Sequence, residues 1–306
     1  MTNGPVTTEA ILVAAEKRTG LTRPQLLVLV AKSATVRHLA THEKYKDLFV
    51  LKGGTLLSNV YLSPRQSIAD ADYTYLDPEN LKVPELEKAL AIDGEYGFYL
   101  YAEDGRWSYK NEMFDGKSLF SMEGIRMSRR PRNRELKVTV SVRAGEWLDR
   151  EGPPLIYRDP LLASDASFPI NGLTRDELAA EKLLGCCSKP LPKHLVDLAY
   201  LAREHHEHIS HENVASLVVD KFRKEKSARR YRDAGISSPA DLVAAFAKPA
   251  RLRELRNEWT RFSSTELLFL PGELAEQESA TLMKVENVER QAIEFWQQTL
   301  DLLHCT

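Results

Sequence analysis

The sequence predicts a mixed α/β (α+β) protein in two parts. Residues 1–165 are expected to form a mixed sheet with helices, and residues 166–306 a helical domain. Up to about residue 145, short apolar or alternating segments are interspersed with helical ones, as in a sheet covered by helices. Beyond about residue 166, helical patterns follow one another. A chain of 306 residues is long enough for two domains or for one large domain.

The N-terminal part begins with two predicted helices, over residues 8–17 and from Thr22 onward, where Thr22 is the expected cap and Pro24 lies in the first turn. A short apolar strand, a glycine turn and another helix follow. The remaining elements predicted up to residue 92 are a strand over 69–76 and a helix over 83–92 opened by Pro84.

Strand-like segments then dominate as far as residue 144. The last of them alternates, so that Val138, Val140 and Val142 share one face. These strands predict a mixed or antiparallel sheet with helices on one side. The strand-like segments are 97–103, 106–114, 118–127 and 135–144, and the later helical patterns are 174–189, 192–206, 212–226, 239–248 and 273–303.

Composition predicts a cytoplasmic protein that does not enter a membrane. No apolar run reaches about twenty residues, the length needed to span a bilayer. The first residues lack the basic and apolar regions of a secretory signal. Three cysteines, two of them adjacent, form no disulfide framework, which fits a reducing compartment.

Two basic clusters stand out in a chain with a net charge of −2. Either cluster alone is typical of a solvated loop or helix face, but two in one near-neutral chain also suggest a surface for RNA phosphates. The candidate RNA-binding residues are Arg126, Arg129, Arg130, Arg132 and Arg134 in the first cluster, and Lys221, Arg223, Lys224, Arg229 and Arg230 in the second.

The stretch after the first predicted strand has the pattern of a phosphate-binding turn. Gly53 and Gly54 allow the backbone to approach a ligand closely, and free N–H groups at a helix start favour an anion. Thr55 adds a hydroxyl donor. The stretch is not a P-loop, because the Gly-Lys-Ser/Thr element is missing. A glycine turn of this kind is more often only a turn.

Asp70 and Asp72 lie two residues apart on a predicted strand, so their side chains share a face. Two carboxylates on one face repel each other unless a cation lies between them. Mg²⁺ binds through one or two carboxylates together with substrate phosphates. The pair, combined with the glycine turn, predicts a site for a metal ion and a nucleoside triphosphate, with Mg²⁺ or Mn²⁺ as the ion.

The combined motifs resemble the AbiEii/AbiGii-type nucleotidyltransferase toxins, which include MenT-like toxins and belong to the polymerase-β-like superfamily. The resemblance is carried by Lys52-Gly53-Gly54-Thr55, Arg65-x-Ser67, Asp70-x-Asp72, Leu178-Ala179-Ala180-Glu181-Lys182-Leu183 and Lys193-His194-Leu195-Val196-Asp197-Leu198. It implies a nucleotidyltransferase-like first domain and a helical domain that completes the active site. The motifs follow in the family's order from about residue 49 to 201.

The sequence departs from the family pattern at three points. One extra residue separates Ser67 from Asp70, and His194 stands where the family often has an acid. The superfamily's third carboxylate is missing, because the best candidate strand offers Thr139 and Ser141 instead. The base for the attacking hydroxyl is therefore unassigned.

The resemblance implies roles for two residues of the second half. Lys182 would contact a phosphate, although a lysine on an amphipathic helix is more commonly just exposed. Asp197 would orient Lys182 or assist proton transfer, and its ordinary alternative is a salt bridge to Lys193, four residues earlier. Lys52, Arg65 and Ser67 are implied to bind the nucleotide together with the glycine turn.

The implied function is that of a toxin of a toxin–antitoxin system. It would transfer a nucleoside monophosphate from an NTP to the 3′ end of tRNA and so block translation, under control of a cognate antitoxin. Three alternatives remain open. They are transfer to a protein hydroxyl, a non-catalytic nucleotide- or RNA-binding role, and a D-x-D glycosyltransferase, which would not need the glycine turn.

Overall fold

The computed structural model describes residues 9–63, 65, 67, 70–77, 79, 82–95, 98–100, 106–110, 113–122, 134–149, 154–159, 167–189, 191–225, 229–246, 253, 256–257, 259 and 284–303. Between residues 93 and 137 it describes the backbone only. The chain divides into two compact units, Met1–Gly172 and Leu173–Thr306. The strand β9 (Phe168–Ile170), which follows the boundary expected near residue 165, pairs with β8 (Leu155–Tyr157) in the first unit.

The first unit contains a mixed sheet in the strand order β1-β2-β7-β6-β4-β3, with β5 also paired to β6. The pair β2–β7 is parallel, and the other pairs of this sheet are antiparallel. This mixed α/β architecture confirms the predicted fold class. The strands are β1 (Phe49–Lys52), β2 (Asp70–Tyr75), β3 (Ile92–Glu95), β4 (Phe98–Leu100), β5 (Arg106–Lys110), β6 (Met113–Met122) and β7 (Arg134–Ala144).

Apolar side chains of β2 and β7 contribute to the core of the first unit. Ala71 and Tyr73 of β2 lie opposite Val140 and Val142 of β7, and all four are at most 1% exposed. Phe49 packs its ring edge against Tyr73 at 5.7 Å between ring centroids. The tyrosines of β2, Tyr73 and Tyr75, are therefore packing residues.

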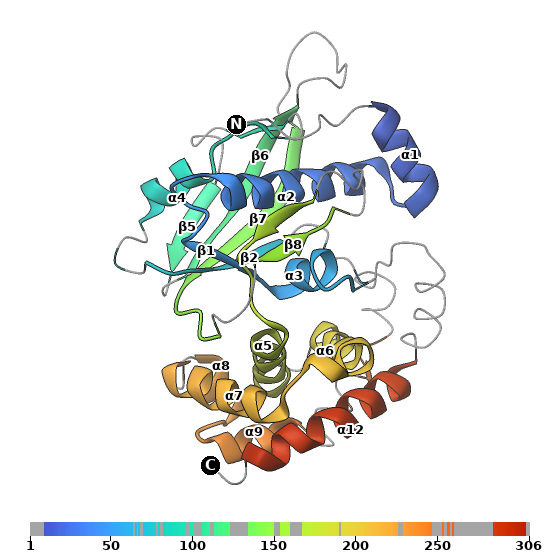
Figure 1. Cartoon of the computed structure of the whole chain (residues 1–306), viewed down its shortest axis with the longest axis vertical. Helices are drawn as coiled ribbons and strands as arrows, with labels where there is room; N and C mark the ends of the chain where they lie inside the picture. Colours follow the sequence, from blue (N-terminus) through green and yellow to red (C-terminus); the bar gives the residue numbers. More distant parts are fainter. Residues whose placement is uncertain are drawn as a thin grey trace. The chain divides into compact units, whose positions relative to one another are not determined.

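Four helices accompany this sheet: α1 (Glu9–Thr19), α2 (Arg23–Thr41), α3 (Gly53–Asn59) and α4 (Val83–Ala89). Figure 1 shows α2 running across one face of the sheet. The backbone N–H of Thr22 donates to Gln25 Oε1 at 2.8 Å, which caps α2 at the predicted residue. The turn predicted at the two glycines is instead the first turn of α3.

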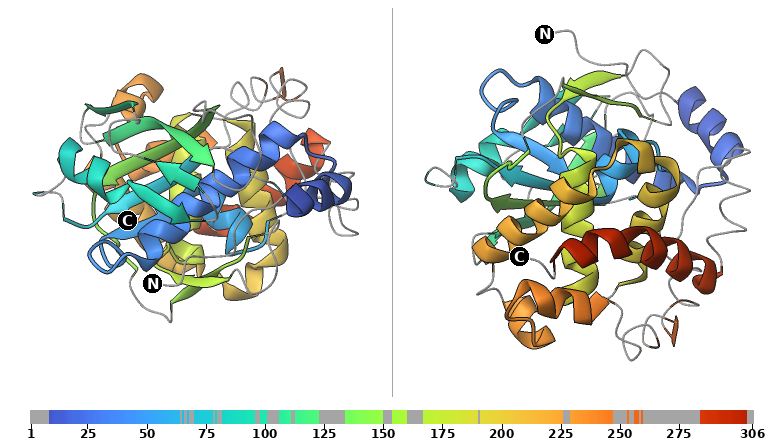
Figure 2. Two further views of the ribbon diagram at one scale, coloured as in Figure 1. Left: turned by 90° about the horizontal axis from the view of Figure 1, so that it is seen from above. Right: turned by 60° about the horizontal axis from the view of Figure 1, so that its bottom comes forward.

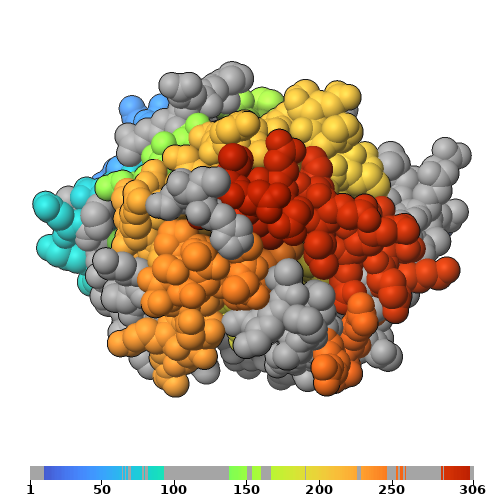
Figure 3. Space-filling view, turned by 90° about the horizontal axis from the view of Figure 1, so that it is seen from below, coloured from blue at the N-terminus to red at the C-terminus, as the bar shows by residue number. Residues whose placement is uncertain are grey.

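The second unit is helical. Its elements are α5 (Arg175–Ser188), α6 (Pro192–Glu204), η4 (His206–His208), α7 (His211–Glu225), α8 (Arg229–Ala234), α9 (Pro239–Phe246) and α12 (Val285–Leu303). The amphipathic α12 packs on α6 and α7, and it forms a ridge on the outer surface of this unit (Figures 2 and 3). Its Trp296 is fully buried and donates its indole N–H to the carbonyl of Leu198 at 3.1 Å. In the described part of the chain, every helix is too short or too polar to cross a lipid bilayer.

His38 on α2 makes the stability of the first unit depend on pH. Burial lowers the pKa of His38 from 6.5 to about 4, and the neighbouring His42 adds to this shift. Below about pH 6.5 the unfolded chain therefore binds a proton that the folded chain does not take up until about pH 4. The free energy of unfolding should fall between these values by up to about 3 kcal/mol.

Urea unfolding of the wild type and of His38→Gln at pH 7.5 and pH 5 checks this expectation. The variant should lose less stability than the wild type between the two pH values. Equal losses in both proteins would contradict the assignment to His38.

Candidate active site

The connection between β1 and α3 brings the backbone against a carboxylate. Lys52 ends β1, and α3 begins at Gly53 without an intervening loop. Gly53 has a φ of +70°, a conformation that side-chain-bearing residues rarely adopt. A Cβ added to Gly53 would also collide with the carboxylate of Asp72. Glycine is therefore required at this position for two independent reasons.

Gly54 leaves room for two side chains of the segment between α3 and β2. A Cβ added there would lie 3.1 Å from Nη2 of Arg65 and 3.1 Å from Cβ of Ser67. Arg65 is only 6% exposed, and its backbone N–H donates to Ser63 Oγ at 3.3 Å. The structure thus brings the guanidinium of Arg65 to the first turn of α3.

The two aspartates predicted to bind a metal lie on one face at the start of β2. Asp70 is exposed and Asp72 is partly buried. Lys52 of β1 lies opposite Asp72 in the antiparallel register, so a lysine and an aspartate are adjacent across the strands. Gly53, Gly54, Arg65, Ser67 and this aspartate pair are therefore gathered in one place within the first unit.

The neighbouring strand β7 supplies no carboxylate beside the pair. Thr139 lies opposite Asp70, and Ser141 lies opposite Asp72. The acid of β7 is Glu135, which lies four residues before Thr139, about 13 Å along the strand. Hydroxyl residues therefore stand opposite both aspartates on β7, and the absence of a third carboxylate of the superfamily stays a prediction.

Thr55 has a different contact from the one expected. Its hydroxyl donates to the backbone carbonyl of Asp70, and the residue is 1% exposed. This hydrogen bond links α3 to the start of β2. A direct contact of Thr55 with a phosphate stays a prediction.

The sequence prediction missed Lys32, which lies in the middle of α2 and is fully buried. Its ammonium donates to the carbonyl of Ser67 at 2.5 Å. Burial lowers the pKa of Lys32 to about 8, while the charges of Asp159 and Asp70 oppose this shift. A lysine inside the apolar run LLVLVAKSATVRHL was the available signal, because a buried ammonium needs partners.

In the second unit, the structure pairs the two residues singled out there. Nζ of Lys182 on α5 lies 2.5 Å from Oδ2 of Asp197 on α6, and their side chains are 8% and 0% exposed. His194 packs against Gly185, where an added Cβ would lie 3.2 Å from three ring atoms. Asp197 therefore holds Lys182 across the two helices, whereas the alternative partner Lys193 is not the one observed.

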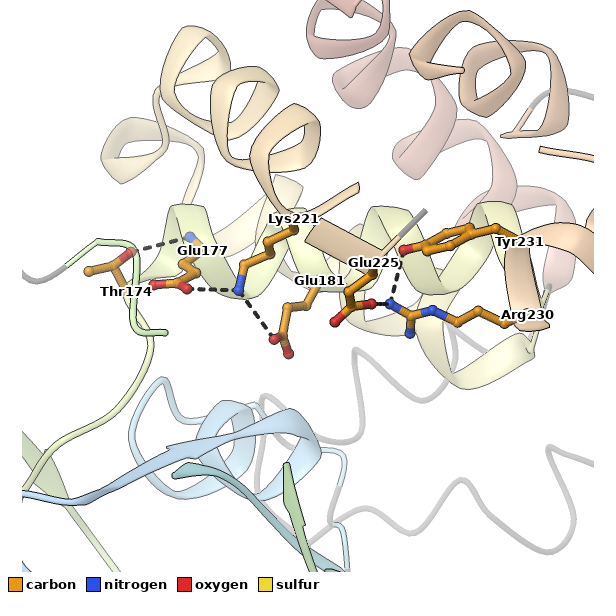
Figure 4. A network of polar contacts seen from close by, with 7 residues as sticks. All are labelled: Thr174, Glu177, Glu181, Lys221, Glu225, Arg230 and Tyr231. Atoms are coloured by element: carbon orange, nitrogen blue, oxygen red, sulfur yellow. Dashed lines mark hydrogen bonds and ion pairs between the residues drawn. The ribbon is translucent and has the colours of Figure 1, made fainter. Parts of the chain in front are cut away.

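Two residues proposed to bind RNA form ion pairs within the second unit, in which Lys221 is nearly buried and Arg230 stays partly exposed. Lys221 lies 2.7 Å from Glu177 and 3.4 Å from Glu181, and its side chain is 12% exposed (Figure 4). The guanidinium of Arg230 contacts Glu225 and the hydroxyl of Tyr231 (Figure 4). The ion pairs of Lys221 connect α7 to α5, and the ion pair of Arg230 connects α8 to α7.

The other candidate RNA-binding residues of this cluster lie at the surface. Arg223, Lys224 and Arg229 are exposed, with Arg223 beside Asp220 and Arg229 beside Asp233. In the first cluster, Arg134 begins β7 opposite Phe120. Arg126, Arg129, Arg130 and Arg132 lie outside the described residues.

In the first unit, a strand leads through two glycines into a helix, beside an aspartate pair on the next strand of a mixed sheet. Residues 36–281 match the family described as "Nucleotidyl transferase AbiEii toxin, Type IV TA system". The chain belongs to this family, so it is a nucleotidyltransferase toxin of a toxin–antitoxin system. The resemblance seen in the sequence is confirmed, and it implies an NTP substrate and an antitoxin.

The fold is similar to that of MenT4, nucleotidyltransferase toxin Rv2826c from Mycobacterium tuberculosis H37Rv. The TM-score is 0.52 at 20% sequence identity, and the similarity covers 94% of this chain and 99% of that chain. A comparison with curated proteins found no match. At this identity the similarity to MenT4 concerns the fold.

Gly53→Ala should abolish activity, with Gly20→Ala as the matched control. Both glycines have positive φ, but a Cβ at Gly20 would meet nothing within 4 Å. Each variant should lose about 1–2 kcal/mol of stability through backbone strain. Only Gly53→Ala should displace Asp72 and stop growth arrest when the toxin is expressed in a bacterial host. Equal toxicity of the two variants would contradict the required approach of Gly53 to Asp72.

Breaking the buried pair of Lys182 and Asp197 should cost about 3 kcal/mol of stability, because the remaining charge is uncompensated. The double variant Lys182→Met/Asp197→Leu should regain most of this stability, as measured by urea unfolding.

All variants of this pair should be non-toxic, whereas the exposed Lys189→Met should resemble the wild type. Toxicity of the stable double variant would show that the pair has only a structural role.

Proposed function

We propose that the protein transfers a nucleoside monophosphate from an NTP to the 3′ end of tRNA in a metal-dependent reaction, and thereby blocks translation. The oxygen of the tRNA hydroxyl would form a bond to the α-phosphorus, and the bond from that phosphorus to pyrophosphate would break. The proposal is supported chiefly by the gathering of Arg65, Ser67, Lys52 and the glycine turn around Asp70 and Asp72.

The residues at the start of β2 fit a divalent metal by their chemistry. Asp70 and Asp72 offer hard carboxylate oxygens on one strand face, with Asp70 exposed. These two residues would hold Mg²⁺ or Mn²⁺, which when bound stabilises the negative charge of a triphosphate. The substrate phosphates would supply further oxygen ligands, as is common for Mg²⁺.

Positive charge for the leaving pyrophosphate would come from two side chains of the first unit. Lys52 lies across from Asp72, and Arg65 lies at the first turn of α3. In the second unit, Lys182 is held in one orientation by its ion pair with Asp197. Preorganised cations stabilise developing charge without having to reorient during the reaction. The backbone of Gly53 and Gly54 would approach the β- and γ-phosphates.

The choice of tRNA as acceptor is supported by exposed basic residues on α7 and α8, namely Arg223, Lys224 and Arg229. Such side chains suit phosphate contacts that position a nucleic acid without reading its sequence. An acceptor of this kind would place the reaction in the cytoplasm.

The proposal is tested with purified protein, Mg²⁺, each α-labelled NTP in turn and total tRNA. The wild type should label tRNA. The double variant Asp70→Asn/Asp72→Asn should be slower by about 100-fold or more, because it loses both proposed ligands of the metal. The matched control is Glu43→Gln/Asp47→Asn, which removes the same charge from two exposed residues of the first unit and should keep its activity.

Label appearing in protein rather than in RNA would show that the acceptor is a polypeptide. Binding of NTP without any transfer of label would favour the alternative that the protein binds nucleotides without catalysing a reaction. Full activity of the double aspartate variant would contradict the role of this site in the reaction.

A further inference from the structure

The helix α2 places a charged side chain inside the first unit. Lys32 is 0% exposed, and its neighbours in the sequence from Leu29 to Thr35 are buried as well. A buried ammonium is strongly unfavourable unless it has hydrogen-bond acceptors and opposite charges around it. Retaining one in a well-packed helix therefore calls for an explanation.

Lys32 contacts the segment that precedes β2. Its Nζ donates to the carbonyl of Ser67 at 2.5 Å. The charges of Asp159 and Asp70 favour the ammonium, and that of Arg65 disfavours it. Lys32 thus lies within electrostatic reach of two residues already assigned to the candidate site.

Ser67 connects Lys32 to the rest of that site. Its Cβ, like Nη2 of Arg65, lies against Gly54. Its hydroxyl is 3.4 Å from the carbonyl of Asp70, which also accepts the hydroxyl of Thr55. The carbonyl held by Lys32 therefore belongs to a residue that stands between Arg65 and Asp70 in the sequence and, like Arg65, lies against Gly54.

We propose that Lys32 is a positioning residue for nucleotidyl transfer, which holds the Ser67 carbonyl and thereby fixes Arg65 and Asp70 relative to the Gly53–Gly54 turn. Lys32 acts through Ser67 and does not itself touch the nucleotide. Displacements of about 1 Å in such a site lower rates by about 100-fold, so one anchoring hydrogen bond has a large effect. The proposal deepens the function proposed above and rests on it where the tRNA assay is used.

The competing explanation is that Lys32 only neutralises Asp159, which is 7% exposed. The two explanations differ for a double variant. Lys32→Met leaves Asp159 without this cation, whereas Lys32→Met/Asp159→Asn removes both charges. If neutralisation is the whole role, the double variant recovers stability and activity together. If Lys32 positions Ser67, stability returns and activity does not.

The experiment compares the wild type, both Lys32 variants and the control Thr35→Val. Thr35 is buried on the same helix, and its hydroxyl donates to Ala31 O within that helix. Thermal unfolding gives the temperature range in which each protein is folded. Within that range, kcat and the KM for the labelled NTP are measured with tRNA as acceptor.

Both Lys32 variants should show a kcat lower by about 10- to 100-fold and a KM for NTP higher by about threefold or more. A smaller folded fraction lowers kcat but leaves KM unchanged, so the rise in KM reports displacement of Arg65. Thr35→Val should match the wild type in both constants. Recovery of kcat and KM in the double variant would overturn the proposal.

Hydrogen exchange of the unliganded proteins provides a measurement that needs no acceptor. In the double variant, peptides covering residues 65–73 should exchange faster, while peptides of α2 and of β7 keep the wild-type rate. If the wild type labels no tRNA, the function proposed above fails, and exchange alone then decides the role of Lys32. Unchanged exchange over residues 65–73 would overturn the proposal.

Discussion

The close approach of the first turn of α3 to the carboxylate of Asp72 is the constraint on which the candidate site depends. Lys52 and Asp72 are register partners, so the end of β1 and the start of β2 cannot move apart without breaking the sheet. The chain must then turn into α3 at a residue with positive φ and no side chain, which is Gly53. Because α3 starts at this point, its first backbone N–H groups have no partners within the helix and lie beside the aspartate pair.

A second principle is the pairing of charges that have been removed from water. In the first unit, the buried Lys32 is balanced by Asp159 and Asp70, and in the second unit Lys182 is balanced by Asp197. Isolated buried charges are costly, whereas paired ones hold their side chains in one orientation. The same pairs that make the burial tolerable therefore also restrict the motion of groups that a reaction would need to keep in place.

The basic cluster of α7 and α8 shows how tertiary contacts change what a charge can do. Lys221 and Arg230 belong to the same run of basic residues as Arg223 and Arg229. Lys221, however, is turned inward between two glutamates of α5, and Arg230 is held by Glu225, whereas Arg223 and Arg229 are exposed (Figure 4). Lys221 and Arg223 differ because helical periodicity sends them to different faces of α7, and the glutamates of α5 lie beside only one of these faces.

The sequence by itself determined the fold class, the family and the type of many elements, because alternation, capping residues and motif order are local properties of the chain. It also singled out Gly53 with Asp72 and Lys182 with Asp197. Only the tertiary structure decided which of these residues touch: that Thr55 bonds the Asp70 carbonyl, that Lys221 is neutralised by α5, and that Lys32 supports Ser67. Such contacts join residues 15 to 44 positions apart, as from Thr55 to Asp70 or from Glu177 to Lys221, and they depend on how helices pack on strands and on one another. No pattern within a single segment of the sequence encodes that packing.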